Sequence, residues 1–116
     1  MHKQIWVGLA EVSPLEGCTS LGGSKGAYVN LMAWAYDAAQ FKLVAERNLA
    51  HLKLVVNELR DPEPWEVRLS APELQQELFE MAQSIAGDTA KVSFGVFHAW
   101  MKEGKNAWAI ESSSQH

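Results

Sequence analysis

AYVNLMAWAY, at residues 27–36, is the segment on which the order of elements in this chain depends. Large side chains alternate with small or branched ones along it, which is typical of a strand whose two faces meet different surroundings. Directly after it, Asp37 and Gln40 have the spacing of a helix N-terminal capping box. We therefore expect a strand over 27–36 and a helix over 38–51. A single helix over 27–51 is the alternative interpretation.

Other segments with a regular hydrophobic pattern lie before and after residues 27–51. Alternating apolar residues predict strands at 4–12, 52–59, 65–69 and 92–101, with a further short strand at 107–111 as an option. A second helix is expected to begin at Ser70, because a Ser N-cap, Pro72 in the first turn and Glu73 combine three start signals. Gly87 is expected to end that helix.

From residue 27 onward the expected order is β-α-β-β-α-β, and with 27–51 as one helix the same order begins at residue 4. This order resembles the split βαβ arrangement of ferredoxin-like folds, which implies an antiparallel sheet with two helices on one face. The strand at 4–12 is then an additional N-terminal strand. We expect one α+β domain over 1–111 and a disordered tail over 112–116. Such a fold does not by itself fix a function.

The composition excludes several classes of protein. The chain has 116 residues, of which 47% are hydrophobic and 21% charged, as in an ordinary globular domain. It shows neither a signal-peptide pattern nor an apolar run near the roughly 18 residues that cross a bilayer. We therefore expect a cytoplasmic protein without a membrane partner. A single cysteine and the lack of clustered metal-ligand residues predict no metal and no cofactor.

Charge is unevenly distributed along the chain, whose formal net charge is −4. Residues 1–57 carry five basic and four acidic side chains, whereas residues 58–116 carry five basic and ten acidic ones. The basic residues are scattered singly, and because nucleic-acid binding needs a basic stripe, no nucleic-acid partner is expected. The acids between Glu58 and Glu80 either form a solvated face or attract a basic protein partner.

Residues 13–26 form a long loop that holds four of the eight glycines. The spacing from Gly17 to Ser24 matches that of a phosphate-binding P-loop, but Gly23 stands where the lysine belongs and a strand follows in place of a helix. Nucleotide hydrolysis is therefore not expected. A site for a small anionic ligand is the weaker hypothesis for this loop. The residues that it would use are Thr19, Ser20, Ser24 and Lys25.

Two side chains are candidates for chemistry. Cys18 lies in the polar loop and is expected to be an exposed thiol, but a nucleophilic cysteine also needs a nearby base. His98 lies in the last strand, where a core or edge histidine is the simpler interpretation. Because the sequence does not bring the two together, we assign no catalytic residue. The sequence leaves open whether the protein is an enzyme, and a non-catalytic role is favoured.

The chain is rich in tryptophan, with five in 116 residues. Strands that are apolar on both faces, in a domain with helices on one face only, leave a second face that needs cover. We therefore expect self-association through the sheet, as a dimer or a larger homo-oligomer. The residues expected at that interface are Trp6, Trp34, Trp100 and Trp108. In the alternative, the segment around Trp108 folds back over that face.

Three hypotheses for the function follow from these observations. The first is a small ligand-binding or protein-interaction module that forms homo-oligomers through its sheet. The second is a small α+β enzyme, with a sheet-face pocket closed by the loop at 13–26 and with His98 or Cys18 taking part. The third is an acidic protein that binds a basic partner, as an inhibitor or an immunity-type protein does.

Overall fold

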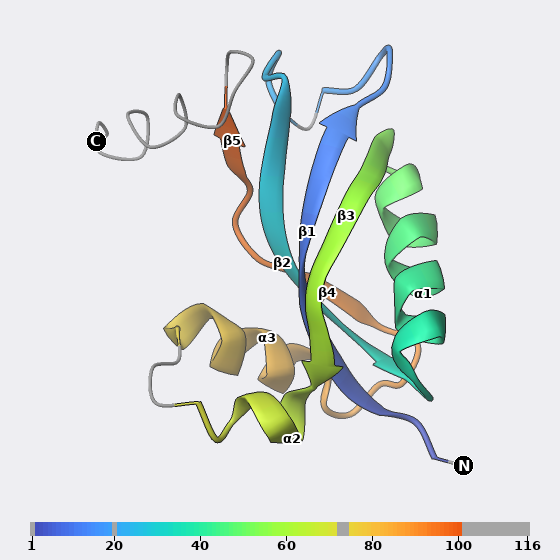
Figure 1. Ribbon diagram of the computed structural model, residues 1–116, viewed down its shortest axis with the longest axis vertical. Helices are drawn as coiled ribbons and strands as arrows, with labels where there is room; N and C mark the ends of the chain where they lie inside the picture. Colours follow the sequence, from blue (N-terminus) through green and yellow to red (C-terminus); the bar gives the residue numbers. More distant parts are fainter. Residues whose placement is uncertain (1, 20, 72–74, 101–116) are drawn as a thin grey trace.

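The computed structural model describes residues 2–19, 21–71 and 75–100, and it has an α+β fold with a five-stranded antiparallel sheet and three helices (Figure 1). The sheet order is β3-β1-β2-β4, and β5 also pairs with β2. No helix in these ranges is long and apolar enough to cross a membrane. The strands are β1 (Gln4–Pro14), β2 (Gly26–Ala35), β3 (Leu54–Pro64), β4 (Val92–Phe94) and β5 (His98–Trp100). The helices are α1 (Ala38–Ala50), α2 (Trp65–Arg68) and α3 (Gln76–Ile85).

The predicted strand at 27–36 and the helix after it are confirmed as β2 and α1. The Asp37 carboxylate accepts a hydrogen bond of 2.8 Å from the backbone N–H of Gln40. In return, the Gln40 side chain accepts one of 2.6 Å from the backbone N–H of Tyr36. These local contacts satisfy backbone donors that the first helical turn leaves unpaired, and they therefore fix where α1 begins.

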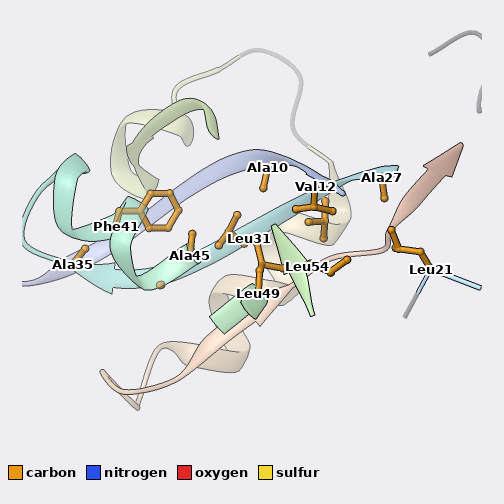
Figure 2. Packing of buried hydrophobic residues seen from close by; sticks show 12 residues of the cluster. Ala10, Val12, Leu21, Ala27, Leu31, Ala35, Phe41, Ala45, Leu49 and Leu54 are labelled. Atoms are coloured by element: carbon orange, nitrogen blue, oxygen red, sulfur yellow. The ribbon is translucent and has the colours of Figure 1, made fainter. Parts of the chain in front are cut away.

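One face of the sheet carries the main hydrophobic core, beneath α1. Phe41 and Leu49 of α1 are fully buried and pack with small and branched residues of β2 such as Leu31 (Figure 2). Gly8 of β1 permits this close approach, because a Cβ there would lie 3.0 Å from Phe41 Cε2 and 3.1 Å from Leu59 Cδ1. A larger residue at this position would therefore press against both side chains.

The opposite face of the sheet carries a second cluster, beneath α3. Leu78 and Ile85 of α3 pack with Val7 and Met32, which alternate along β1 and β2 with the residues beneath α1. The prediction that both helices lie on one face is therefore wrong, and the ferredoxin-like split βαβ topology is not confirmed. β1 and β2 are apolar on both faces because α1 packs on one face and α3 on the other.

β3 is longer than the predicted strand at 52–59 and continues through both prolines to Pro64. β3 tolerates proline because it is an edge strand, with a neighbour on one side only. Its pairing with β1 shifts register twice, once between Glu11 and Val12 and once between Val7 and Leu9. Near the second shift Asp61 has a φ of 49°, in the left-handed region.

The predicted strand at 65–69 is wrong, because this segment forms the single helical turn α2. Three alternating apolar residues are too short a pattern to separate a strand from one turn of helix. The predicted N-cap at Ser70 is also wrong: the Ser70 hydroxyl donates to the Val67 carbonyl at 2.7 Å, and α3 begins at Gln76. Pro72 and Glu73 lie outside the described residues.

The predicted strand at 92–101 is divided into β4 and β5, which pair with different parts of β2. In the break between them, the Gly95 N–H donates to the Asn30 carbonyl at 2.8 Å. A Cβ at Gly95 would overlap the Glu77 carboxylate, so a side chain there would displace this carboxylate from its present position. The expected short strand at 107–111 and the tail at 112–116 lie outside the described residues.

Candidate ligand-binding groove

α3 covers only part of its face of the sheet. A ten-residue helix such as α3 is about 15 Å long, whereas a ten-residue strand such as β2 spans about 33 Å. The α3 end of this face carries Val7 and Met32, which pack beneath the helix. The other end carries Leu9, Tyr28 and Asn30, which line a hollow.

This hollow has a volume of about 490 Å³, within the range typical of small-ligand sites. A second hollow of about 440 Å³ shares four of its lining residues, namely Leu9, Asn30, Arg60 and Gln75. We call the two together the sheet-face groove. The residues that line its first part are Leu9, Tyr28, Asn30, Arg60, Gln75 and His98.

Arg60 reaches from β3 across the central strand β1 toward β2. Its guanidinium carbon lies 5.1 Å from the centroid of the Tyr28 ring, within the distance of a cation–π contact. Nη2 lies 3.2 Å from Glu11 Oε1, and Nε lies 3.1 Å from Glu58 Oε1. The hydrogen bond to Glu58 raises the pKa of Arg60, so the guanidinium stays charged. The Glu11 side chain is only 15% exposed, and the ion pair compensates much of the cost of burying its charge.

Asn30 is held from the side of α3. Its Nδ2 donates to Gln75 Oε1 at 3.1 Å and to Glu77 Oε1 at 3.0 Å. The second carboxylate oxygen of Glu77 accepts from the backbone N–H of Val96 at 2.8 Å. Glu77 therefore ties α3 both to β2 and to the break between β4 and β5, and this tie fixes the end of the sheet-face groove nearest the helix.

An additional ion pair lies in the second part of the groove. Arg68 of α2 pairs with Glu63 of β3 through its Nε, and its Nη2 donates to the Asp61 carbonyl at 3.2 Å. Because this segment forms the helix α2 and not the predicted strand, Arg68 contacts the edge strand β3. As a result, both arginines of the groove have carboxylate partners.

The glycine-rich loop lies against the other face of the sheet. Cys18 and Leu21 pack with the core beneath α1, and the Cys18 thiol donates to the Leu52 carbonyl at 3.3 Å. Cys18 is therefore half-buried, and the predicted exposed thiol is wrong. Together with Ser24 and Lys25 it lines a separate hollow of about 370 Å³.

The other loop residues proposed for an anion site do not all meet there. Ser24 is buried and Lys25 exposed at the small hollow, whereas Thr19 is exposed and does not line it. Ser20 lies outside the described residues. Within the described part of the chain, no residue of the loop lines the sheet-face groove.

His98 of β5 lies opposite Tyr28 of β2 in the strand register, and it lines the sheet-face groove. Among the candidate site residues that the structure describes, His98 alone lines the groove. Cys18 packs on the α1 side, so the structure does not bring the thiol and the imidazole together. A group of three or more potential metal ligands is not found among the described residues.

Two of the four tryptophans expected at one interface, Trp6 and Trp34, lie on different sides of the sheet. Trp6 packs with the core beneath α1, with its ring centroid 6.2 Å from that of Phe41. Trp34 packs beneath α3 and donates from Nε1 to the Ile85 carbonyl at 2.7 Å. Trp6 and Trp34 therefore do not form one patch. The Trp100 side chain and Trp108 lie outside the described residues.

Sequence reasoning missed most of the groove. Its central residues Tyr28, Asn30 and Arg60 come from two strands that are not neighbours, and periodicity in one segment does not reveal that they meet. A signal was present, since Glu11 and Asn30 are polar interruptions on the same face of two otherwise apolar strands. Comparisons with protein-family models, curated proteins and solved structures find no match, so the function is argued from this groove.

Proposed function

We propose that this protein binds a small organic ligand in the sheet-face groove. The observation that carries the proposal is the placement of Arg60 over Tyr28, with Glu11 as its partner, on the half of the sheet face that α3 leaves open. Ligand sites typically combine an apolar floor with a few converging polar groups. Leu9 and Tyr28 supply such a floor, and Asn30 supplies a fixed polar group beside it.

A purely structural role for this face would be met more simply by apolar residues. The Glu11 side chain is only 15% exposed, and a carboxylate buried to this extent costs free energy unless it is paired, while such a pair rarely stabilises more than a well-packed apolar contact. The α3 half of the same face shows the apolar solution in Val7 and Met32. The polar half is therefore better explained by a ligand than by stability.

The positions of Cys18 and His98 favour a binding function over a catalytic one. A nucleophilic mechanism needs a nucleophile within hydrogen-bond reach of a base. Among the described residues, the candidate thiol of Cys18 and the imidazole of His98 are on different faces of the sheet. The enzyme hypothesis of the sequence therefore has less support than the ligand-binding hypothesis.

Self-association through the sheet stays a prediction, and the form of the sheet edges argues against strand-to-strand pairing. β3 has two register shifts and carries Pro62 and Pro64, all of which discourage the addition of another strand. β4 and β5 at the other edge are three residues each. The basic-partner hypothesis also stays a prediction, although Glu77 is engaged by Asn30 and Val96.

The proposal is tested by following backbone amide signals in ¹H–¹⁵N correlation spectra while small probes are added. The probes are uracil, benzoate and benzamidine, which are neutral, anionic and cationic. We expect at least one of them to shift the amide signals of Leu9, Tyr28 and Asn30 and to leave those of α1 unchanged. The variant Arg60→Gln should lose this response, whereas Arg47→Gln, on the exposed side of α1, should keep it.

Two results would contradict the proposal. In the first, no probe shifts the groove signals up to its solubility limit. In the second, the shifts are confined to residues 13–26, which would favour the small hollow beside Ser24 and Lys25 instead.

A further inference from the structure

We infer that the ligand of the sheet-face groove is an uncharged, planar molecule that both donates and accepts hydrogen bonds, as a cyclic amide does. The inference rests on the proposed binding function and concerns the class of ligand. It follows from the hydrogen-bonding groups that the groove leaves for a ligand, and from the charges that surround them.

Asn30 supplies the acceptor. Its Nδ2 group donates to both Gln75 and Glu77, and these two bonds fix the orientation of the carboxamide. Within the described part of the chain, Oδ1 has no hydrogen-bond partner, and Asn30 lines both parts of the groove. A ligand N–H is the group that satisfies it.

Gln75 and Arg60 supply the donors. Oε1 of Gln75 is engaged by Asn30, so its Nε2 group is left to donate. Arg60 uses Nη2 toward Glu11 and Nε toward Glu58, which leaves the two N–H groups of Nη1. A ligand carbonyl is the group that these donors fit.

The Arg60 guanidinium also favours a flat ligand. Its carbon lies 5.1 Å from the centroid of the Tyr28 ring, and guanidinium groups also stack on planar π systems. A planar ring on the groove side of Arg60 would have the flat guanidinium as a stacking partner. Arg60 lines both parts of the groove, as such a position requires.

The charges around the groove disfavour an ionic ligand of either sign. An anion would find both arginines already paired, Arg60 with Glu11 and Glu58 and Arg68 with Glu63. A cation would meet the Arg60 guanidinium, which occupies the position over Tyr28 that a cationic ligand would take. An uncharged ligand avoids both costs.

The test compares the three probes at the same groove signals, and uracil represents the proposed class. We expect uracil to shift the side-chain amide signals of Asn30 and Gln75, and to bind about tenfold more tightly than benzoate or benzamidine. Gln75→Ala should weaken uracil binding about tenfold, because it removes one donor and one of the two bonds that orient Asn30, whereas Gln76→Ala, its exposed neighbour, should not. Asn30→Ala should have an effect at least as large as that of Gln75→Ala.

The outcomes separate the two proposals. If benzoate or benzamidine binds the groove more tightly than uracil, the inferred ligand class is wrong and the binding function stands. If Gln75→Ala and Gln76→Ala bind uracil equally, the donor assignment is overturned. If no probe shifts a groove signal, the binding function itself fails. Gln75→Ala changes an exposed side chain before α3, so it keeps the test decisive even where Asn30→Ala is poorly folded.

Discussion

The two faces of the sheet are built on different principles. Beneath α1, the side chains that β1 and β2 present are small or branched, and Ala10, Val29 and Leu31 are fully buried. On the other face, α3 covers one end over Val7 and Met32, and the remaining end carries Tyr28 and other polar groups. One face is therefore covered by the main core, and the other divides its area between a second cluster and the sheet-face groove. This difference locates the groove.

The largest expected effect is on the α1 face. Phe41→Ala removes a fully buried ring from the main core, and it should lower the free energy of unfolding by about 3–5 kcal/mol. Urea denaturation followed by circular dichroism measures the change. Leu43→Ala is the matched control on the same helix, because Leu43 is 58% exposed and its truncation should change stability by less than about 0.5 kcal/mol. Equal effects of the two changes would contradict the assignment of this face as the main core.

A smaller effect is expected beneath α3. Ile85→Ala removes a fully buried side chain from the second cluster, and it should cost about 2–4 kcal/mol in the same experiment. Phe79→Ala is the control on this helix, since its ring is 39% exposed and contacts Trp65 at the surface. Should Ile85→Ala leave stability unchanged, α3 would not be the cover of this face.

The strand at 27–36 and the helix after it have strong local signals, and this explains why the sequence predicts them. Asp37 and Gln40 mark the start of α1 with side chains that contact neighbouring backbone, so the signal and the structure lie in the same few residues. The strand at 27–36 has regular alternation over ten positions. Trp65–Arg68 offers only four residues, and there the pattern favours a strand where the chain forms a turn of helix.

The sequence does not predict how segments that are distant along the chain pack against one another. The apolar stripes of the two helices do not indicate which face each one covers, because that depends on how the chain crosses the sheet. The groove has the same origin: Tyr28, Asn30 and Arg60 meet only because β1 lies between β2 and β3. Of the candidates from sequence, His98 reaches the groove, and Cys18 does not, because Leu52 and the core beneath α1 hold the loop.

A still smaller loss of stability is expected when the hydrogen bonds of Glu77, which join α3 to β2 and to the break between β4 and β5, are weakened. Glu77→Gln replaces a carboxylate that accepts from Asn30 and Val96 with an amide that can accept through one atom only, so it should destabilise by about 1–2 kcal/mol. Glu80→Gln, on the exposed side of the same helix, is the control. Thermal unfolding of both variants provides the comparison, and a larger loss for Glu80→Gln would rule out the structural role of Glu77.

The smallest expected effect concerns backbone conformation on the groove side. Asp61 has a φ of 49°, where glycine carries no steric penalty, so Asp61→Gly should raise the free energy of unfolding by about 0.5 kcal/mol. Lys53→Gly is the counterpart after α1, with a φ of 61°. Similar gains at both positions would show that the strain at Asp61 is ordinary turn geometry. A loss at Asp61 alone would show that its side chain supports the groove.

The division of the last strand has a consequence for local opening. β4 adjoins the break that Glu77 holds, whereas β5 is joined to β2 by a separate set of three residue pairs. Short units of this kind exchange their amide hydrogens through local fluctuations that leave the rest of a domain folded. His98 is therefore held at the groove by only three residue pairs, whereas Asn30 is also held by side chains from the α3 side. Because Ala99 of β5 packs against the core beneath α1, loosening of this short strand would also uncover part of that core.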